Sequence, residues 1–225
     1  MKIGIIGGTG GMGEGFALRW SFNHEIILGS RDKQKAQDIA KNHMDVLKGS
    51  SYHEKINGNI SGNDNVSVAR ESDVLILSIP YENIQNTCKD IENVISEDCI
   101  IVSPIVPMSR NQSGFYYVPF VEGKKSAGVM VRENLPNCDK IVSAFHTISE
   151  VKLKDIESPL NADTFICTDN KEVLVNINDL IGEIEGLRSI YLGSLELSYQ
   201  AEMMTPMILN ASKQNKLKHP GIKLV

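Results

Sequence analysis

The chain has 225 residues, of which 41% are apolar and 23% charged, and its formal net charge is −5. This composition is that of an ordinary globular protein and excludes a largely disordered chain. The negative charge argues against a nucleic-acid binder, which would present a basic face to the phosphate backbone. No apolar run approaches the roughly 20 residues that cross a bilayer, and the first residues lack a signal-peptide cleavage site. We therefore expect a cytoplasmic protein with neither nucleic-acid nor membrane partners.

The four cysteines are scattered along the chain, and no two of them form a Cys-x-x-Cys pair: Cys88, Cys99, Cys138 and Cys167. Neither a zinc site nor a disulfide framework has this spacing. We expect reduced thiols, as in most cytosolic proteins, and no bound metal.

Apolar, β-branched runs alternate with amphipathic segments of helical length, which is typical of a parallel sheet with helical crossovers. Strands are predicted at 3–6, 25–28, 74–79, 99–102, 141–145, 164–167 and 189–192, with a short one inside the Gly-, Ser- and Asn-rich stretch 49–65. Helices are predicted after the first glycine turn, after Asp32, and at 83–94, 171–185 and 195–217.

The pattern predicts an α/β fold: a Rossmann-type doubly wound, mostly parallel sheet with helices on both faces and a small C-terminal lobe. We expect an NADP-binding Rossmann domain over residues 1–145. Residues 146–225 are expected to form the α/β lobe that completes the cofactor pocket.

A glycine-rich turn, Gly8-Thr9-Gly10-Gly11-Met12-Gly13, follows the first predicted strand and opens an amphipathic helix. This G-x-G-x-x-G pattern is weak alone and specific in that context. Gly10 lets the backbone approach a pyrophosphate, Gly13 lets the helix pack close to the strand, and the helix start supplies free N–H groups. The sequence therefore predicts a dinucleotide site.

The residues after the second strand indicate which dinucleotide binds. An NAD enzyme usually places Asp or Glu there to hold the ribose hydroxyls. This chain has Gly29-Ser30-Arg31 instead, and Lys35 follows one helical turn later. A hydroxyl and two cations favour the 2′-phosphate of NADP.

Proline-stiffened apolar segments follow the fourth and fifth strands, at Pro80-Tyr81 and 103–110. Ligands of open α/β sheets lie at this edge, so these segments predict a dry pocket for a flat ring, although surface loops have the same composition. His146 is open to two interpretations, a catalytic group or a loop-stabilising hydrogen-bond partner. The methionines Met203, Met204 and Met207 are expected in the core or in a subunit contact.

Strings distributed over the whole chain resemble the F420-dependent NADP reductases. They are the glycine turn through Gly15, Gly29-Ser30-Arg31-x-x-x-Lys35, Ile79-Pro80, Ser103-Pro104-x-Val106-Pro107, His146-Thr147-Ile148, Glu185-Gly186-Leu187-Arg188, Thr205-Pro206 and Gly221-Ile222-Lys223. The Ser-Pro-x-Val-Pro and His-Thr-Ile strings are more specific than the glycine turn.

The resemblance implies an enzyme that transfers a hydride reversibly between NADP(H) and the deazaflavin coenzyme F420, acting as a homodimer. It implies cofactor contacts from Thr9, Gly10, Gly11, Met12, Ser30, Arg31, Lys35, Tyr81, Val106, Met108, Glu150 and Pro220. Hydride transfer between two stacked rings requires no side-chain nucleophile or general base, so no catalytic residue is predicted.

The chain departs from the family pattern at three of these positions. Gly11 replaces an expected asparagine, Glu150 an expected small residue, and Pro220 an expected leucine; the 49–65 stretch is also longer. The alternative functions are an NADPH-dependent flavin or ferric reductase and a non-catalytic NADPH sensor. A hydroxyacid or imine reductase would need a proton donor near the nicotinamide and a longer helical second domain.

Overall fold

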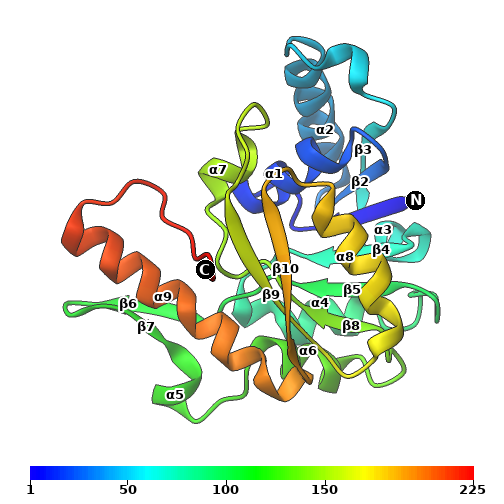
Figure 1. The fold of residues 1–225 in the computed structure, drawn as a ribbon. Coiled ribbons are helices and arrows are strands. Elements are labelled where there is room, and N and C mark those ends of the chain that lie inside the picture. The colour runs from blue at the N-terminus through cyan, green and yellow to red at the C-terminus, as the bar shows by residue number, and fades with distance from the viewer.

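The computed structural model describes residues 1–225, and its strands form one central sheet and one separate hairpin (Figure 1). The strands are β1 (Lys2–Ile6), β2 (Glu25–Ser30), β3 (Asn59–Asp64), β4 (Val74–Leu77), β5 (Ile100–Ser103), β6 (Met108–Asn111), β7 (Gly114–Tyr117), β8 (Ile141–Ser143), β9 (Ala162–Thr168) and β10 (Leu187–Gly193). The helices are α1 (Gly11–Trp20), α2 (Lys33–Lys48), α3 (Asn65–Glu71), α4 (Ile84–Ile91), α5 (Val118–Glu122), α6 (Ala127–Asn134), α7 (Glu150–Lys154), α8 (Leu174–Gly182) and α9 (Ser198–Asn215).

The central sheet has the strand order β10-β9-β8-β5-β4-β1-β2-β3. Every neighbouring pair is parallel except β8 and β9, which are antiparallel. The carboxyl ends of β1, β2, β4, β5 and β8 therefore share one edge, and β9 begins at that same edge. The expected doubly wound, mostly parallel sheet is confirmed.

Two hydrophobic clusters cover the two faces of the sheet. In β4, Val74 and Ile76 belong to one cluster, and Leu75 and Leu77 to the other. All four are buried, as expected of a strand covered by helices on both faces. Helices α1, α2, α7 and α8 contribute to the first cluster, and α3, α4 and α6 to the second.

The predicted strands and helices are present, with ends shifted by a few residues, and 49–65 contains β3 as expected. Three features differ. Helices α3, α5, α6 and α7 were not predicted. The proline-stiffened segment 103–110 leads into β6, and the antiparallel hairpin that β6 forms with β7 was not predicted. The strand predicted over 141–145 ends at Ser143, because Phe145 has a left-handed backbone with a φ of 68°.

The last 80 residues extend the same sheet through β9 and β10, and α9 lies beside the hairpin (Figure 1). The Asn210 amide of α9 holds the hairpin: its Oδ1 accepts from Phe115 N at 2.8 Å, and its Nδ2 donates to Phe115 O at 2.7 Å. The expected division at residue 145 stays a prediction.

No helix of the structure combines the length and apolar character needed to cross a membrane. All four cysteines are free thiols.

Candidate functional site

The glycine turn between β1 and α1 is built so tightly that side chains are excluded from its inner side. Gly7 has a φ of 77°, and a Cβ atom there would lie 2.0 Å from the carbonyl oxygen of Ser78. A Cβ atom on Gly13 would lie 2.6 Å from Gly8 Cα. Strand and helix approach each other as closely as the sequence pattern requires.

The outer side of the turn is open. A Cβ atom on Gly10 would meet only the Gly7 carbonyl, at 3.5 Å. No side chain caps α1, and its N–H groups at residues 11–13 have no hydrogen-bond partner, since the first capping bond joins Glu14 N to Gly10 O. Unpaired N–H groups at a helix start fit a phosphate. Thr9, Gly10, Gly11 and Met12 all lie on this turn.

The end of β2 presents cations that are free of carboxylate partners. The Asp32 carboxylate caps α2 by accepting from Lys35 N at 3.1 Å, and Ser30 Oγ accepts from Asp32 N at 3.2 Å. The side chains of Arg31 and Lys35 are exposed and take part in no ion pair. These residues suit a phosphate on the nucleotide ribose.

Asn65, at the start of α3, is a residue that sequence reasoning missed here. Its Oδ1 is buried without a hydrogen-bond partner, and a Cβ atom on Gly29 would lie 2.8 Å from it. A buried polar atom without a hydrogen-bond partner is uncommon. Its sequence signal is weak, because Asn65 looks like an ordinary turn residue.

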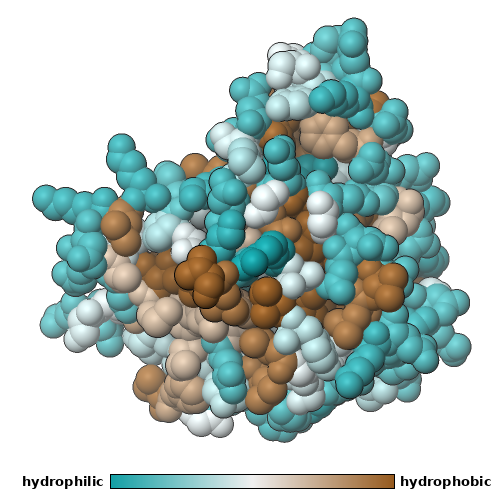
Figure 2. All heavy atoms as spheres, viewed as in Figure 1, coloured by the Kyte–Doolittle hydropathy of each residue, from teal (hydrophilic) through white to brown (hydrophobic).

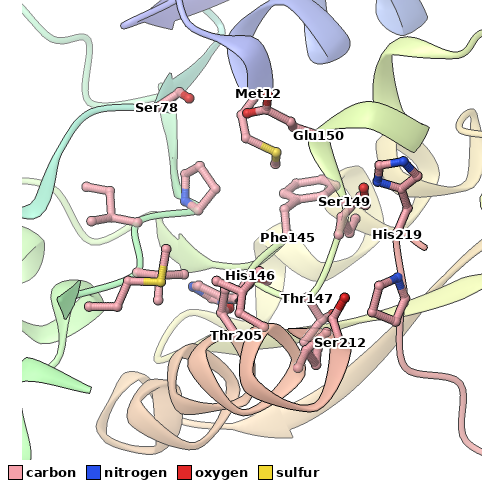
Figure 3. A pocket seen from close by; sticks show the side chains of 18 of the residues that line it. Met12, Ser78, Phe145, His146, Thr147, Ser149, Glu150, Thr205, Ser212 and His219 are labelled. Carbon is pink, nitrogen blue, oxygen red and sulfur yellow. Dashed lines mark hydrogen bonds between the residues drawn. The ribbon is translucent and has the colours of Figure 1, made fainter. Parts of the chain in front are cut away.

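A cavity of about 500 Å³ opens beneath the turn at the carboxyl edge of the sheet (Figure 3). Its size is in the range of small-molecule sites. It contains five of the expected contact residues: Met12, Val106, Met108, Glu150 and Pro220. Further lining residues are Ser78, Ile79, Pro104, Ile105, Phe145, His146, Thr147, Ile148, Ser149, Thr205, Ile208, Leu209, Ser212 and His219.

Tyr81 is the expected contact residue that neither the turn, the end of β2 nor the cavity contains. It lies in a turn of 3-10 helix after Pro80, and its ring belongs to the hydrophobic cluster on the α4 face of the sheet. Its hydroxyl donates to the Lys125 carbonyl at 3.3 Å. The aromatic ring is thus part of the core beside the site.

The floor of the cavity is a strained turn after β8. Phe145 has a φ of 68°, which is costly for a bulky side chain. Two hydroxyl groups fix the turn: Phe145 N donates to Thr164 Oγ1 at 2.6 Å, and Thr205 Oγ1 donates to the His146 carbonyl at 2.6 Å. The Phe145 ring packs edge-on against Phe16 and Trp20. The strain is held by contacts from three other elements.

The His146 side chain is buried in this floor and carries no charge at neutral pH. Its Nε2 lies 3.1 Å from Ser143 Oγ, whereas its Nδ1 has no partner. Burial lowers the pKa of the imidazole to about 3. The Ser103 hydroxyl, also buried, likewise lacks a partner. The arrangement suits a neutral hydrogen-bonding residue and not an imidazolium acid.

The far wall of the cavity comes from the C-terminal segment. His219 and Pro220 line it, and the segment after them is fixed to the start of β9 by Asp163. The Asp163 backbone N donates to Ile222 O at 2.8 Å, and the Asp163 carboxylate accepts from Leu224 N at 2.6 Å. Arg188 donates to both oxygens of that carboxylate, at 2.7 and 2.8 Å.

Pro220 was predicted in this wall, whereas His219 and the individual α9 side chains that line the cavity were not. Thr205, Ile208, Leu209 and Ser212 come from one face of α9. The Thr205-Pro206 string was the available signal, since it belongs to the family likeness. The contact with His146 could not be read from it, because it depends on how α9 packs.

Known proteins resemble the chain along its full length. The family model described as "NADP oxidoreductase coenzyme F420-dependent" matches residues 2–107. An F420-dependent NADP reductase from Methanocaldococcus jannaschii is 35% identical over all of this chain and 98% of its own length. That from Methanothermobacter marburgensis is 29% identical over the same shares.

Solved structures agree in fold. The crystal structure of a putative F420 dependent NADP-reductase from Arthrobacter sp. FB24 superposes with a TM-score of 0.81 at 16% identity, covering 100% of this chain and 99% of that one. Prephenate dehydrogenase from A. aeolicus superposes with a TM-score of 0.54 over 88% of this chain.

Proposed function

This chain belongs to the F420-dependent NADP reductase family, and from that premise we propose that hydride passes between the two cofactors inside the cavity beneath the glycine turn. The chain is an oxidoreductase of NADP and coenzyme F420. The observation that carries the proposal is the full-length 35% identity. The cavity lies next to the open phosphate turn, where a bound nucleotide can reach it.

The nucleotide is gripped at its two phosphate groups. Residues 9–12 offer the pyrophosphate unpaired N–H groups and the positive end of the α1 dipole. Ser30, Arg31 and Lys35 would hold the 2′-phosphate, and the charges of the two cations are used in no ion pair of the structure. This site would favour NADP over NAD, because NAD lacks the 2′-phosphate with which the two cations form charge-assisted hydrogen bonds.

The two rings are stacked by the apolar walls of the cavity. A deazaflavin supplies, when bound, a ring carbon that accepts or donates a hydride. Val106, Met108 and Pro220 would contact the bound rings, and hydride transfer would require the reacting carbons to lie about 3–3.5 Å apart. His146 offers a neutral hydrogen-bonding nitrogen from the floor. The protein would position the two rings and limit the access of water to them, and no side chain would act as an acid or base.

We further propose that the protein is a cytoplasmic homodimer. Large apolar residues are exposed on the face that carries α5 and α9 (Figure 2): Phe120 at 63%, Val121 at 70% and Met207 at 57%. Exposed apolar residues gathered on one face support an interface between subunits. Residues 1–145 form the nucleotide domain and 146–225 the lobe that closes the pocket.

A turnover assay tests the proposed reaction. NADPH oxidation is followed spectroscopically with F420, FMN, FAD or a ferric chelate offered in parallel at matched concentration. We expect turnover with F420 to exceed that with every other acceptor. Faster turnover with FMN, FAD or the ferric chelate would identify a flavin or ferric reductase, and tight NADPH binding without any turnover would identify a sensor.

A further inference from the structure

One face of α1 is shaped to receive α7. Gly11, Gly15 and Arg19 lie four residues apart and therefore on one side of the helix. A Cβ atom on Gly15 would lie 2.7 Å from Leu153 Cγ, so α7 packs directly against the α1 backbone. The Arg19 guanidinium donates to four carbonyl oxygens at the end of α7, those of Lys152, Leu153, Asp155 and Ser158. Helix α7 is fixed on α1.

This packing places the first residue of α7 over the first residue of α1. A Cβ atom on Gly11 would lie 2.6 Å from Cδ, Oε1 and Oε2 of Glu150, so the carboxylate occupies the space that a side chain there would fill. Figure 3 shows Glu150 beside Met12 at the top of the cavity. Its one cationic partner is Lys154, whose Nζ forms a partly exposed ion pair with Oε1 at 3.9 Å and lies closer to Glu14, at 3.6 Å.

The carboxylate makes no hydrogen bond to the turn, yet its charge lies at the positive end of α1. A negative charge at a helix start stabilises the helix. The pyrophosphate of a bound nucleotide requires the same place and carries the same sign. At a few ångströms, two like charges near a protein surface repel each other strongly enough to change an affinity severalfold.

We propose that Glu150 is a resident anion at the phosphate turn, which the nucleotide displaces on binding, and that it lowers the affinity for both NADP and NADPH and speeds their release. The inference rests on the proposed function, because it assumes that the turn binds this nucleotide. Gly11 is the matching adaptation, since any larger residue would exclude the carboxylate.

The test is the isosteric substitution Glu150→Gln, which removes the charge and keeps the shape. NADPH affinity and dissociation rate are measured by fluorescence titration and stopped flow without any acceptor. We expect a Kd about three- to tenfold lower at low ionic strength, mostly through a slower dissociation rate. The gain should shrink as salt is raised, because exposed charges are screened.

Glu97→Gln is the matched control. Glu97 is exposed and precedes β5, so the substitution removes the same charge at the opposite edge of the sheet. Its NADPH Kd should equal that of the unsubstituted protein. A second readout needs no nucleotide: Glu150→Gln should lower the melting temperature of the free protein slightly, since α1 loses its resident anion.

Two results would overturn the inference. Weaker NADPH binding by Glu150→Gln would make Glu150 a direct contact of the nucleotide, and an affinity equal to that of Glu97→Gln would mean that its charge has no part in binding. A protein that binds no NADPH at all would overturn the proposed function itself, and the unsubstituted chain alone reveals that outcome.

Discussion

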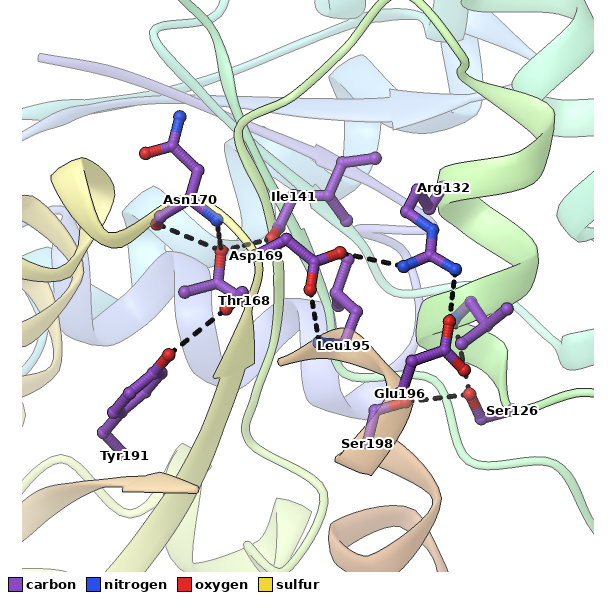
Figure 4. Close-up of polar contacts among 11 residues, drawn as sticks. Ser126, Arg132, Ile141, Thr168, Asp169, Asn170, Tyr191, Leu195, Glu196 and Ser198 are labelled. Carbon is purple, nitrogen blue, oxygen red and sulfur yellow. Dashed lines mark hydrogen bonds and ion pairs between the residues drawn. The ribbon is translucent and has the colours of Figure 1, made fainter. Parts of the chain in front are cut away.

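Basic side chains at the two opposite edges of the sheet differ in their ion-pair partners. Arg132, at the amino edge, donates to Asp169 at 2.8 Å and to Glu196 at 2.6 Å (Figure 4). Asp169 in turn accepts from Leu195 N at 3.1 Å, which ties α6 to the segment before α9. Arg31 and Lys35, at the carboxyl edge, have no such partners. Paired charges connect elements, whereas the unpaired ones are available to a ligand.

Buried polar groups differ in the same way. The Glu202 carboxylate of α9 is fully buried, and it accepts from Tyr117 Oη at 2.7 Å and from the N–H groups of Ala127 and Gly128 at 3.0 Å. His146 Nδ1, in the floor of the cavity, and the buried Ser103 Oγ have no hydrogen-bond partner. The fully hydrogen-bonded Glu202 carboxylate has a structural role, because it joins α9 to α6 and β7.

The largest expected effect comes from a charge placed in the apolar wall. Val106→Asp should reduce hydride transfer to F420 at least about a hundredfold, because a misplacement of about 1 Å between the rings can cost that much. NADPH affinity should change little, since the phosphates are held elsewhere. The rate is measured in single-turnover assays and the affinity by titration. Val175→Asp, on the exposed side of α8, is the control and should keep normal activity; normal activity of Val106→Asp would contradict the proposed ring site.

The second-largest effect is expected on substitution of an unpaired cation, Arg31, in contrast to the paired Arg132. Arg31→Ala should weaken NADPH binding by roughly ten- to a hundredfold, because a charge-assisted contact is lost. NADH binding should hardly change. Both affinities are measured by titration, and Arg132→Ala should leave both unchanged. Equal losses for the two nucleotides would mean that Arg31 does not contact the 2′-phosphate.

A smaller effect concerns pH. The imidazole of His146 stays neutral in the folded protein because burial lowers its pKa to about 3, while in the unfolded chain it takes up a proton as the pH falls below the ordinary pKa of 6.5. Stability therefore falls as the pH drops below about 6.5, by about 1 kcal/mol from this group between pH 6.5 and 5.5. Burial also lowers the pKa of His43, which adds to the same trend.

The variant His146→Asn should remove the His146 share of this pH dependence, which denaturant unfolding at pH 7.5, 6.5 and 5.5 will measure. Its turnover should fall only about tenfold or less, without loss of a titrating limb between pH 5 and 8. A loss near a thousandfold with a vanished limb would make His146 a general acid, since such groups contribute about 10²–10⁴-fold.

The smallest effect is expected at the paired cation. Arg132→Ala should lower the free energy of unfolding by less than about 1 kcal/mol, because solvent-exposed ion pairs contribute little to stability. The melting temperature should fall by no more than about 2–4 °C. A larger loss would mean that the network in Figure 4 holds α6 in place more firmly than its exposure indicates.

Local patterns predicted the parts of the fold that depend on local chemistry. The run of β4 is apolar at every position, so a strand covered on both faces followed from it directly. The phosphate turn followed in the same way, because its glycines are required by close backbone contacts within a few residues. Ser30, Arg31 and Lys35 could be predicted as neighbours because they lie at the end of β2 and the start of α2.

The features that were missed depend on contacts distant in sequence. The residues of β6 are all exposed, so its sequence shows no alternation of apolar and polar residues. The hairpin is instead fixed by hydrogen bonds between Phe115 and Asn210, which is 95 residues away in sequence. The burial of Tyr81 depends on the packing of neighbouring helices. The Glu150 carboxylate reaches the turn only because α7 docks on α1, which no local pattern encodes.

The cavity is lined from both ends of the chain, by Met12 and by Pro220. During synthesis the phosphate turn leaves the ribosome early, whereas residue 220 follows roughly 10–40 s later at about 5–20 residues per second. The antiparallel reversal between β8 and β9 is what brings that late segment back to the early one. A nascent chain can thus form the glycine turn well before the residues that complete the cavity have been synthesised.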